Sequence, residues 1–132
     1  MAYATALLRD PAQTYRQIDI AGRTAVGDGA ALVQLLYEEL VAALRAAAWA
    51  CEHGQYAKKS ERVTRATAIL FALEAGLDFD QGGEVSVTLS RLYGGMRSTI
   101  VNASIGGDPA PFRDCADSLA EIAQAWRTAR AA

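Results

Sequence analysis

The chain has 132 residues, of which 52% are hydrophobic and 21% are charged. This length suits one domain with a single core, and the composition is too apolar for a chain that is disordered throughout. Thirteen Lys and Arg against fifteen Asp and Glu give a formal net charge of −2, so no chain-wide basic field exists to attract nucleic acid or an anionic membrane. We therefore expect a globular protein that binds no nucleic acid and does not insert into a membrane.

The residue types also limit the cellular compartment and the metal or disulfide chemistry that we expect. Cys51 and Cys115 are too few for a disulfide framework and too far apart in sequence for a zinc knuckle. The first ten residues lack a basic start followed by a long apolar run, and eighteen consecutive apolar residues occur nowhere. We therefore expect a cytoplasmic protein in a reducing compartment, with no metal and no other cofactor.

Residues 1–27 come first and are predicted to form an N-terminal arm. Apolar side chains such as Tyr15 and Ile18 alternate there with Pro11 and with glycines. The arm is too apolar to float freely in solvent and too often broken to form a long helix. We expect one short helix after Pro11 and docking of the arm onto the domain formed by residues 28–132.

Four helical patterns follow the arm. The first runs over residues 30–52 with Asp28 as its expected N-cap, and the others cover residues 57–77, 84–104 and 111–130. In each pattern, apolar residues recur at steps of three and four, which places them on one face of a helix. The predicted core residues are, in chain order, Leu32, Leu36, Leu40, Val41, Leu44, Ala47, Ala48 and Cys51, then Val63, Ala66, Leu70, Leu73 and Leu77, then Val85, Leu89, Leu92, Met96, Ile100 and Ala103, and finally Phe112, Cys115, Leu119, Ile122 and Trp126.

Short connections between long helices indicate antiparallel neighbours. The predicted fold is therefore all-α, an antiparallel up-down four-helix bundle with an N-terminal arm that carries a short helix. This topology brings Cys51 and Cys115 to the same end of the bundle, where two small buried hydrophobic residues explain them better than a redox switch. Trp49 and Trp126 are either core residues or anchors for a partner helix.

The sequence offers little for catalysis. Metal-binding bundles need inward-facing Glu and His at helical spacing, and His53 is the one histidine of the chain. It stands at the end of the first predicted helix, where a histidine commonly satisfies a backbone carbonyl or the helix dipole. We expect no enzyme. A histidine phosphotransfer bundle that uses His53 remains one alternative, although that class carries its histidine in the middle of a helix near basic residues.

Several motifs in a fixed order resemble the flagellar secretion chaperone family FliS. They include the segment LVQLLYEE at 32–39, the segment RATAIL at 65–70, Leu77-Asp78 followed by Gly82-Gly83-Glu84, and Trp126 near the end of the fourth helix. The resemblance implies a four-helix bundle that binds the disordered C-terminal segment of flagellin in the cytoplasm, prevents its early polymerisation and delivers it to the flagellar export gate. It also implies an N-terminal arm that covers part of the flagellin site when the chaperone is empty.

One departure from the family pattern lies in the third helix. Gly94-Gly95 stands where the family usually has an acidic residue and an aromatic one. Two glycines inside a helix are explained by a kink, by simple sequence drift, or by a surface that a client approaches closely.

The predicted client surface comes from apolar residues outside the main stripes of the helices. One face of a helix cannot bury them all, and an exposed apolar patch needs a cover, either the arm or a client helix. A dimerising structural bundle, and hence a homodimer, is a third reading of the same surplus. The residues expected to bind the client are Tyr15, Ile18, Leu35, Tyr37, Ile69 and Tyr93.

Overall fold

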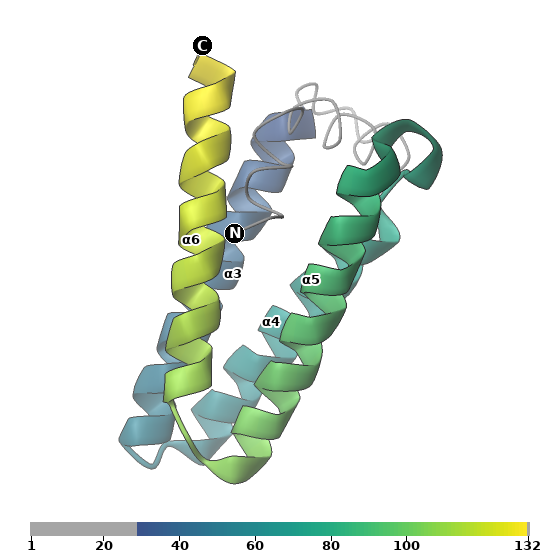
Figure 1. Ribbon diagram of the computed structural model, residues 1–132. Helices are drawn as coiled ribbons and strands as arrows, with labels where there is room; N and C mark the ends of the chain where they lie inside the picture. Colours follow the sequence, from purple (N-terminus) through teal and green to yellow (C-terminus); the bar gives the residue numbers. More distant parts are fainter. Residues whose placement is uncertain (1–28, 132) are drawn as a thin grey trace.

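The computed structural model describes residues 29–131, which form four α-helices and no strands. The helices are α3 (Gly29–Glu52), α4 (Tyr56–Ala75), α5 (Phe79–Gly106) and α6 (Ala110–Ala131). The chain reverses its direction at each connection (Figure 1). The predicted all-α bundle is thus confirmed. The short helix expected after Pro11 and the Asp28 cap lie outside the described residues.

The helices do not pack equally on one another. α3 lies against both α4 and α6, whereas α5 packs mainly against α4 and touches α6 much less. At the lower end of Figure 1, the end of α3 and the start of α6 come together, as the topology requires of Cys51 and Cys115. Both cysteines are free thiols. None of the helices in the described part is long and apolar enough to cross a membrane.

The start of α5 shows why two glycines separate the second and third predicted helices. The Asp78 side chain caps the helix by accepting a hydrogen bond of 2.9 Å from the backbone N–H of Gln81. At Gly83 the backbone has φ 52° and ψ −125°, a conformation that is not helical and that favours glycine. α5 is therefore kinked at Gly83, and its longer part begins where the sequence predicted, at Glu84. Gly94 and Gly95 lie in regular helix, so the kink considered there is wrong.

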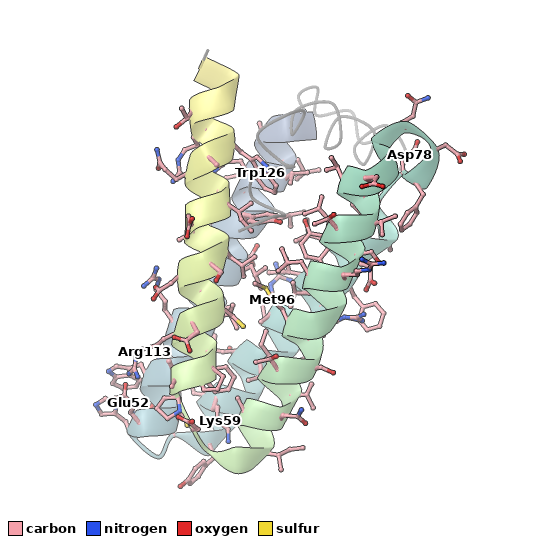
Figure 2. The ribbon with its side chains drawn as sticks, in the orientation of Figure 1. Glu52, Lys59, Asp78, Met96, Arg113 and Trp126 are labelled. Atoms are coloured by element: carbon pink, nitrogen blue, oxygen red, sulfur yellow. The ribbon has the colours of Figure 1, made fainter. Side chains whose placement is uncertain are left out.

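The other end of α5 is held by several groups. Gly107 adopts the left-handed conformation with φ 76°, and its N–H donates to the Ala103 carbonyl. The buried Lys59 of α4 donates from Nζ to the Ser104 carbonyl at 2.8 Å, which supplies a positive charge to the negative end of the helix dipole. Lys59 and Asp78 therefore mark opposite ends of the α4–α5 pair (Figure 2). The turn predicted at residues 105–109 begins only at Gly107, because α5 continues through Gly106.

The core follows the predicted apolar stripes, except that α3 is rotated about its axis relative to the prediction. The seam residues of α4 and α6 are all buried, while Leu32 and Leu36 of α3 are only half-buried. In their place, α3 buries Val33 and Tyr37. The Tyr37 hydroxyl lies 2.6 Å from the Tyr93 hydroxyl of α5, and the Tyr37 ring meets the Trp126 ring edge-on at 4.2 Å between centroids. Tyr37 thus joins three helices in the centre of the bundle.

Candidate functional site

A surface groove runs between α4 and α5 and has a volume of about 660 Å³. The residues from each helix recur at steps of three, four and seven, so each helix contributes a single face. The groove extends along about two helical turns, or roughly 10 Å. It is lined by Thr64, Thr67, Ala68 and Phe71 of α4 and by Gly94, Arg97, Ser98, Val101 and Asn102 of α5.

Two large apolar side chains border this groove without being covered. Phe71 is 62% exposed and Val101 is 45% exposed. Their burial by a partner would be favourable by about 25 cal/mol for each Å² of apolar surface removed from water. The groove therefore has the shape and the apolar content of a site for a short amphipathic helix.

Gly94 belongs to the lining of the groove and has no side chain to place there. A Cβ atom at this position would lie 3.7 Å from Arg97 Nη2 and 3.9 Å from Glu74 Oε2, both ordinary van der Waals distances. Glycine is therefore not required for α4 and α5 to pack, and its effect is to leave room in the groove. The structure excludes the kink at Gly94-Gly95, and the close-approach surface stays a prediction.

Arg97 is the charged member of the groove lining. Its Nη2 lies 2.5 Å from Glu74 Oε1, and the other Glu74 oxygen accepts a hydrogen bond of 3.1 Å from Ser90 Oγ. Its guanidinium also lies over the Phe71 ring, with Cζ 4.1 Å from the ring centroid. The ion pair is about one quarter exposed, with side-chain exposures of 22% and 25%.

The residues predicted to bind a client divide into three groups. Leu35 is on the surface, with 62% of its area exposed. Tyr37, Ile69 and Tyr93 are buried at 0%, 3% and 0% exposure, so the expectation that they form an accessible surface is wrong. The inward face of each helix is wider than one stripe and includes them. Tyr15 and Ile18 of the arm lie outside the described residues.

Sequence reasoning missed most of the groove. None of the six residues expected to bind the client belongs to its lining. A signal was present in α5, because Val87, Gly94 and Val101 follow at steps of seven and share a face opposite the buried Leu89 and Tyr93. Val87 and Val101 are indeed exposed, at 40% and 45%.

His53 has the capping position that the sequence favoured. Its Nδ1 lies 2.7 Å from the Trp49 carbonyl oxygen, and because a carbonyl only accepts, Nδ1 is the donor. The His53 ring also stacks on the Trp49 ring, with 4.2 Å between centroids and an angle of 19°. Trp49 is 43% exposed, whereas Trp126 is buried. The first is thus a surface aromatic and the second a core residue.

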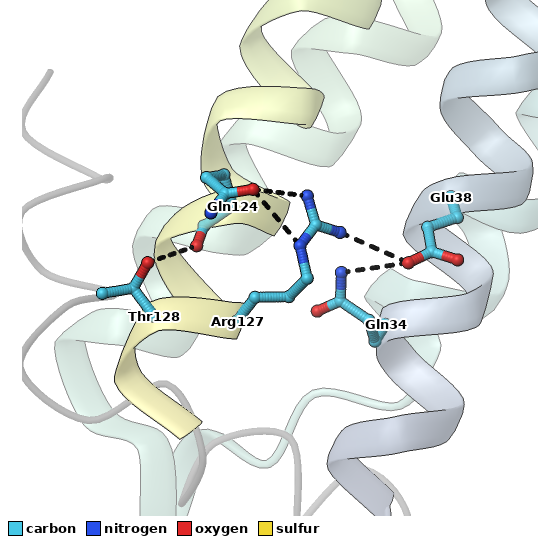
Figure 3. A network of polar contacts seen from close by, with 5 residues as sticks. All are labelled: Gln34, Glu38, Gln124, Arg127 and Thr128. Carbon is cyan, nitrogen blue, oxygen red and sulfur yellow. Dashed lines mark hydrogen bonds and ion pairs between the residues drawn. The ribbon is translucent and has the colours of Figure 1, made fainter. Parts of the chain in front are cut away.

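The junction of α3 and α6 differs from the α4–α5 groove because ion pairs cross it along its length. Arg127 Nη1 lies 3.3 Å from Glu38 Oε2, Arg45 pairs with Asp117, and Arg113 pairs with Glu52 (Figure 2). Gln34 and Gln124 add hydrogen bonds to Glu38 and Arg127, as Figure 3 shows. Such exposed pairs contribute little to stability. Their effect is to make this face polar.

Cys115 is buried in the core at the start of α6. Burial raises the pKa of its thiol, and the neighbouring negative charge of Asp114 raises it further. The Cys51 thiol donates a hydrogen bond of 3.1 Å to the Gly107 carbonyl. The raised pKa of Cys115 suits a structural thiol rather than a nucleophile, since the thiolate is the reactive form.

Comparison with known proteins gives one consistent result. The family described as flagellar protein FliS matches residues 10–132. The flagellar secretion chaperone FliS of Salmonella typhimurium is 28% identical over 116 residues, which cover 87% of this chain and 86% of that protein. The flagellar secretion chaperone FliS of Vibrio cholerae is 26% identical, over 90% of this chain and 88% of its own. The flagellar secretion chaperone FliSB of Pseudomonas aeruginosa is 29% identical, over 85% and 89%.

Proposed function

This chain belongs to the FliS family of flagellar secretion chaperones, and we propose that its client is the disordered C-terminal segment of flagellin. The family is one of chaperones and not of enzymes, and its members act in flagellar export. The observation that carries the proposal is the α4–α5 groove with its exposed Phe71 and Val101.

The proposed mechanism is helix-in-groove binding. A disordered segment that enters the groove folds into an amphipathic helix, and the ordering cost of several kcal/mol is offset by apolar burial. The balance gives a large contact area with moderate affinity, which suits a chaperone that must release its client. While bound, the segment cannot take part in polymerisation. The chaperone would hold it so in the cytoplasm and deliver it to the flagellar export gate.

A second part of the proposal concerns contacts beyond the groove. Leu35 is exposed on α3 and stays a predicted contact of the client outside the groove. The arm, residues 1–27, is proposed to compete with the client for apolar surface through Tyr15 and Ile18. Competition of this kind would keep the empty chaperone from exposing its full apolar surface.

The test is calorimetric titration of the whole chain with a synthetic peptide of the flagellin C-terminal segment. We expect binding with a negative heat-capacity change, from apolar burial, and a gain of helical circular dichroism. Full-length flagellin should be retained in a pull-down, and flagellin without its C-terminal segment should not. Absence of binding at micromolar peptide would contradict the proposal. A peptide-indifferent oligomer in light scattering would support the dimerising bundle instead.

A matched pair of variants locates the site. Phe71→Glu removes apolar contact area and puts a second carboxylate beside the Arg97–Glu74 ion pair. It should lower peptide affinity by roughly 10-fold or more, because binding would desolvate the excess negative charge. Phe79→Glu is the control, since Phe79 is 52% exposed but lies at the start of α5, outside the groove lining. Equal losses in the two variants would place the client elsewhere.

A further inference from the structure

The one charge in the lining of the α4–α5 groove is neutralised by another residue of the same chain. Among its lining residues Arg97 is the one ionisable side chain, and Glu74 already neutralises it at 2.5 Å. Ser90 holds the second oxygen of that carboxylate. The other polar groups of the lining are the hydroxyls of Thr64, Thr67 and Ser98 and the amide of Asn102, all of them neutral.

The Arg97 guanidinium is fixed but has donors to spare. It is clamped between Glu74 and the face of Phe71. A guanidinium carries five N–H donors in a rigid fork, and the contacts to Glu74 use Nη2. Nε is buried and has no hydrogen-bond acceptor among the residues that the structure describes. The chain itself shields Nε, so a client oxygen would bind the terminal nitrogens of the guanidinium instead, through the 22% of the Arg97 side chain that stays exposed.

Resting on the proposed function, we propose that Arg97 is the specificity-determining residue of the groove and selects a client helix with a neutral oxygen acceptor. That acceptor is the side-chain amide of an Asn or Gln, flanked by apolar residues three or four positions away. The flanking residues cover Phe71 and Val101, and the absence of a side chain at Gly94 lets the client backbone come close.

Charged and apolar residue types at that client position are disfavoured for separate reasons. Asp or Glu would bring a second carboxylate towards Glu74, and Lys or Arg would face the positive charge of Arg97. An apolar side chain would remove water from the ion pair without replacing its hydrogen bonds. An amide oxygen accepts from the guanidinium and adds no charge.

The experiment combines the whole chain with variants of the synthetic flagellin C-terminal peptide. Each Asn and Gln of the peptide is replaced in turn by Ala and by Glu, and affinities are measured by calorimetry. We expect one position at which Ala lowers the affinity for the wild-type chain by roughly 10-fold, the size of a hydrogen bond to a charged group. In Arg97→Gln the same peptide change should have little further effect, because the two groups act as one interaction.

Two further variants test whether the planar shape of the Arg97 guanidinium and its place in the groove matter, beyond its positive charge. Arg97→Lys keeps the charge but loses the planar fork, so we expect it to lose most of the discrimination. Arg91→Gln is the matched control, because Arg91 is an exposed arginine of α5 outside the groove lining, and it should bind like the wild type. Circular dichroism melts establish that each variant is folded. Binding should also change less than about 2-fold between about 50 and 500 mM KCl, since no net charge is neutralised.

The outcomes distinguish this inference from the proposed function. If Phe71→Glu abolishes binding while Arg97→Gln binds and discriminates like the wild type, the groove holds the client and the role of Arg97 is refuted. If the Arg97 variants instead lose the effect of replacing an acidic peptide residue, and binding depends strongly on salt, the proposal that the client residue is neutral is refuted. Failure of the wild-type chain to bind the peptide would overturn the proposed function and the inference with it.

Discussion

Exposure separates residues that hold the fold from residues available to a partner, even when they are neighbours in sequence. Ile69 is 3% exposed and Phe71 is 62% exposed, although they lie two positions apart on α4. Positions two apart lie on nearly opposite sides of a helix, since each residue turns about 100°. The two residues therefore test different properties of the same element.

Truncation of these two side chains should have opposite effects: one should mainly lower stability and the other should mainly weaken client binding. Ile69→Ala leaves a cavity in the core and should lower the free energy of unfolding by about 2–5 kcal/mol. Phe71→Ala removes a surface side chain that lies under Arg97, and should lower it by less than about 1 kcal/mol. Urea unfolding followed by circular dichroism measures both. A large loss of stability in Phe71→Ala would mean that the groove wall is part of the core.

The same two variants also carry a binding readout. Phe71→Ala should weaken binding of the flagellin peptide, whereas Ile69→Ala should bind it normally at temperatures where it stays folded. If the truncation of Ile69 weakened binding as strongly in a folded protein, the earlier expectation of a direct contact would regain support.

At the scale of the element, α5 carries glycines with different functions. Gly83 and Gly107 have positive φ, of 52° and 76°, and bound the regular part of the helix. Gly94 and Gly95 lie in regular helix, and a Cβ at Gly95 would meet nothing within 4 Å. Positive φ favours glycine, while in a helix interior glycine costs conformational entropy.

The effect of alanine substitution on the free energy of unfolding should therefore differ in sign between the glycines of α5. Gly95→Ala should raise the free energy of unfolding by about 0.5–1 kcal/mol, since alanine is the better helix former and the site is open. Gly107→Ala should lower it by roughly 1–2 kcal/mol, because alanine is strained in the left-handed region. Chemical denaturation compares them. Destabilisation by Gly95→Ala would show that its surface is covered.

At the scale of the whole molecule, the bundle has two unlike faces. The α3–α6 junction is crossed by ion pairs, and the α4–α5 groove is apolar with one neutralised charge. α5 packs mainly against α4 and touches α6 much less, while α4 also packs extensively against α3. The polar α3–α6 junction carries a smaller pocket, of about 420 Å³, beside the exposed Trp49.

The arm makes a prediction at this scale. If residues 1–27 compete with the client, deletion of residues 1–20 should tighten or accelerate peptide binding, because the bound arm no longer has to be displaced. Titration of the deletion variant against the full chain measures the difference. Weaker binding after the deletion would instead make the arm a part of the client site.

The sequence by itself determined the helices, their breaks and most of the core. The apolar repeats at three and four residues and the glycine and proline signals are local along the chain, so the seams of α4 and α6 could be read directly. Tyr37 and Tyr93 were misplaced because each lies beside the expected stripe, next to Leu36 and Leu92. Their burial depends on how far α3 and α5 rotate about their axes against their neighbours.

Only the tertiary structure decided which surplus apolar residues stay exposed and what surrounds them. Arg97, Glu74 and Phe71 come from two helices and lie up to 26 positions apart, and no spacing rule connects them. Their contacts arise from the way α4 and α5 pack, through side-chain shape and the distance between the axes. The periodicity of one helix can be read from the order of its residues, whereas the groove depends on how two helices pack against each other.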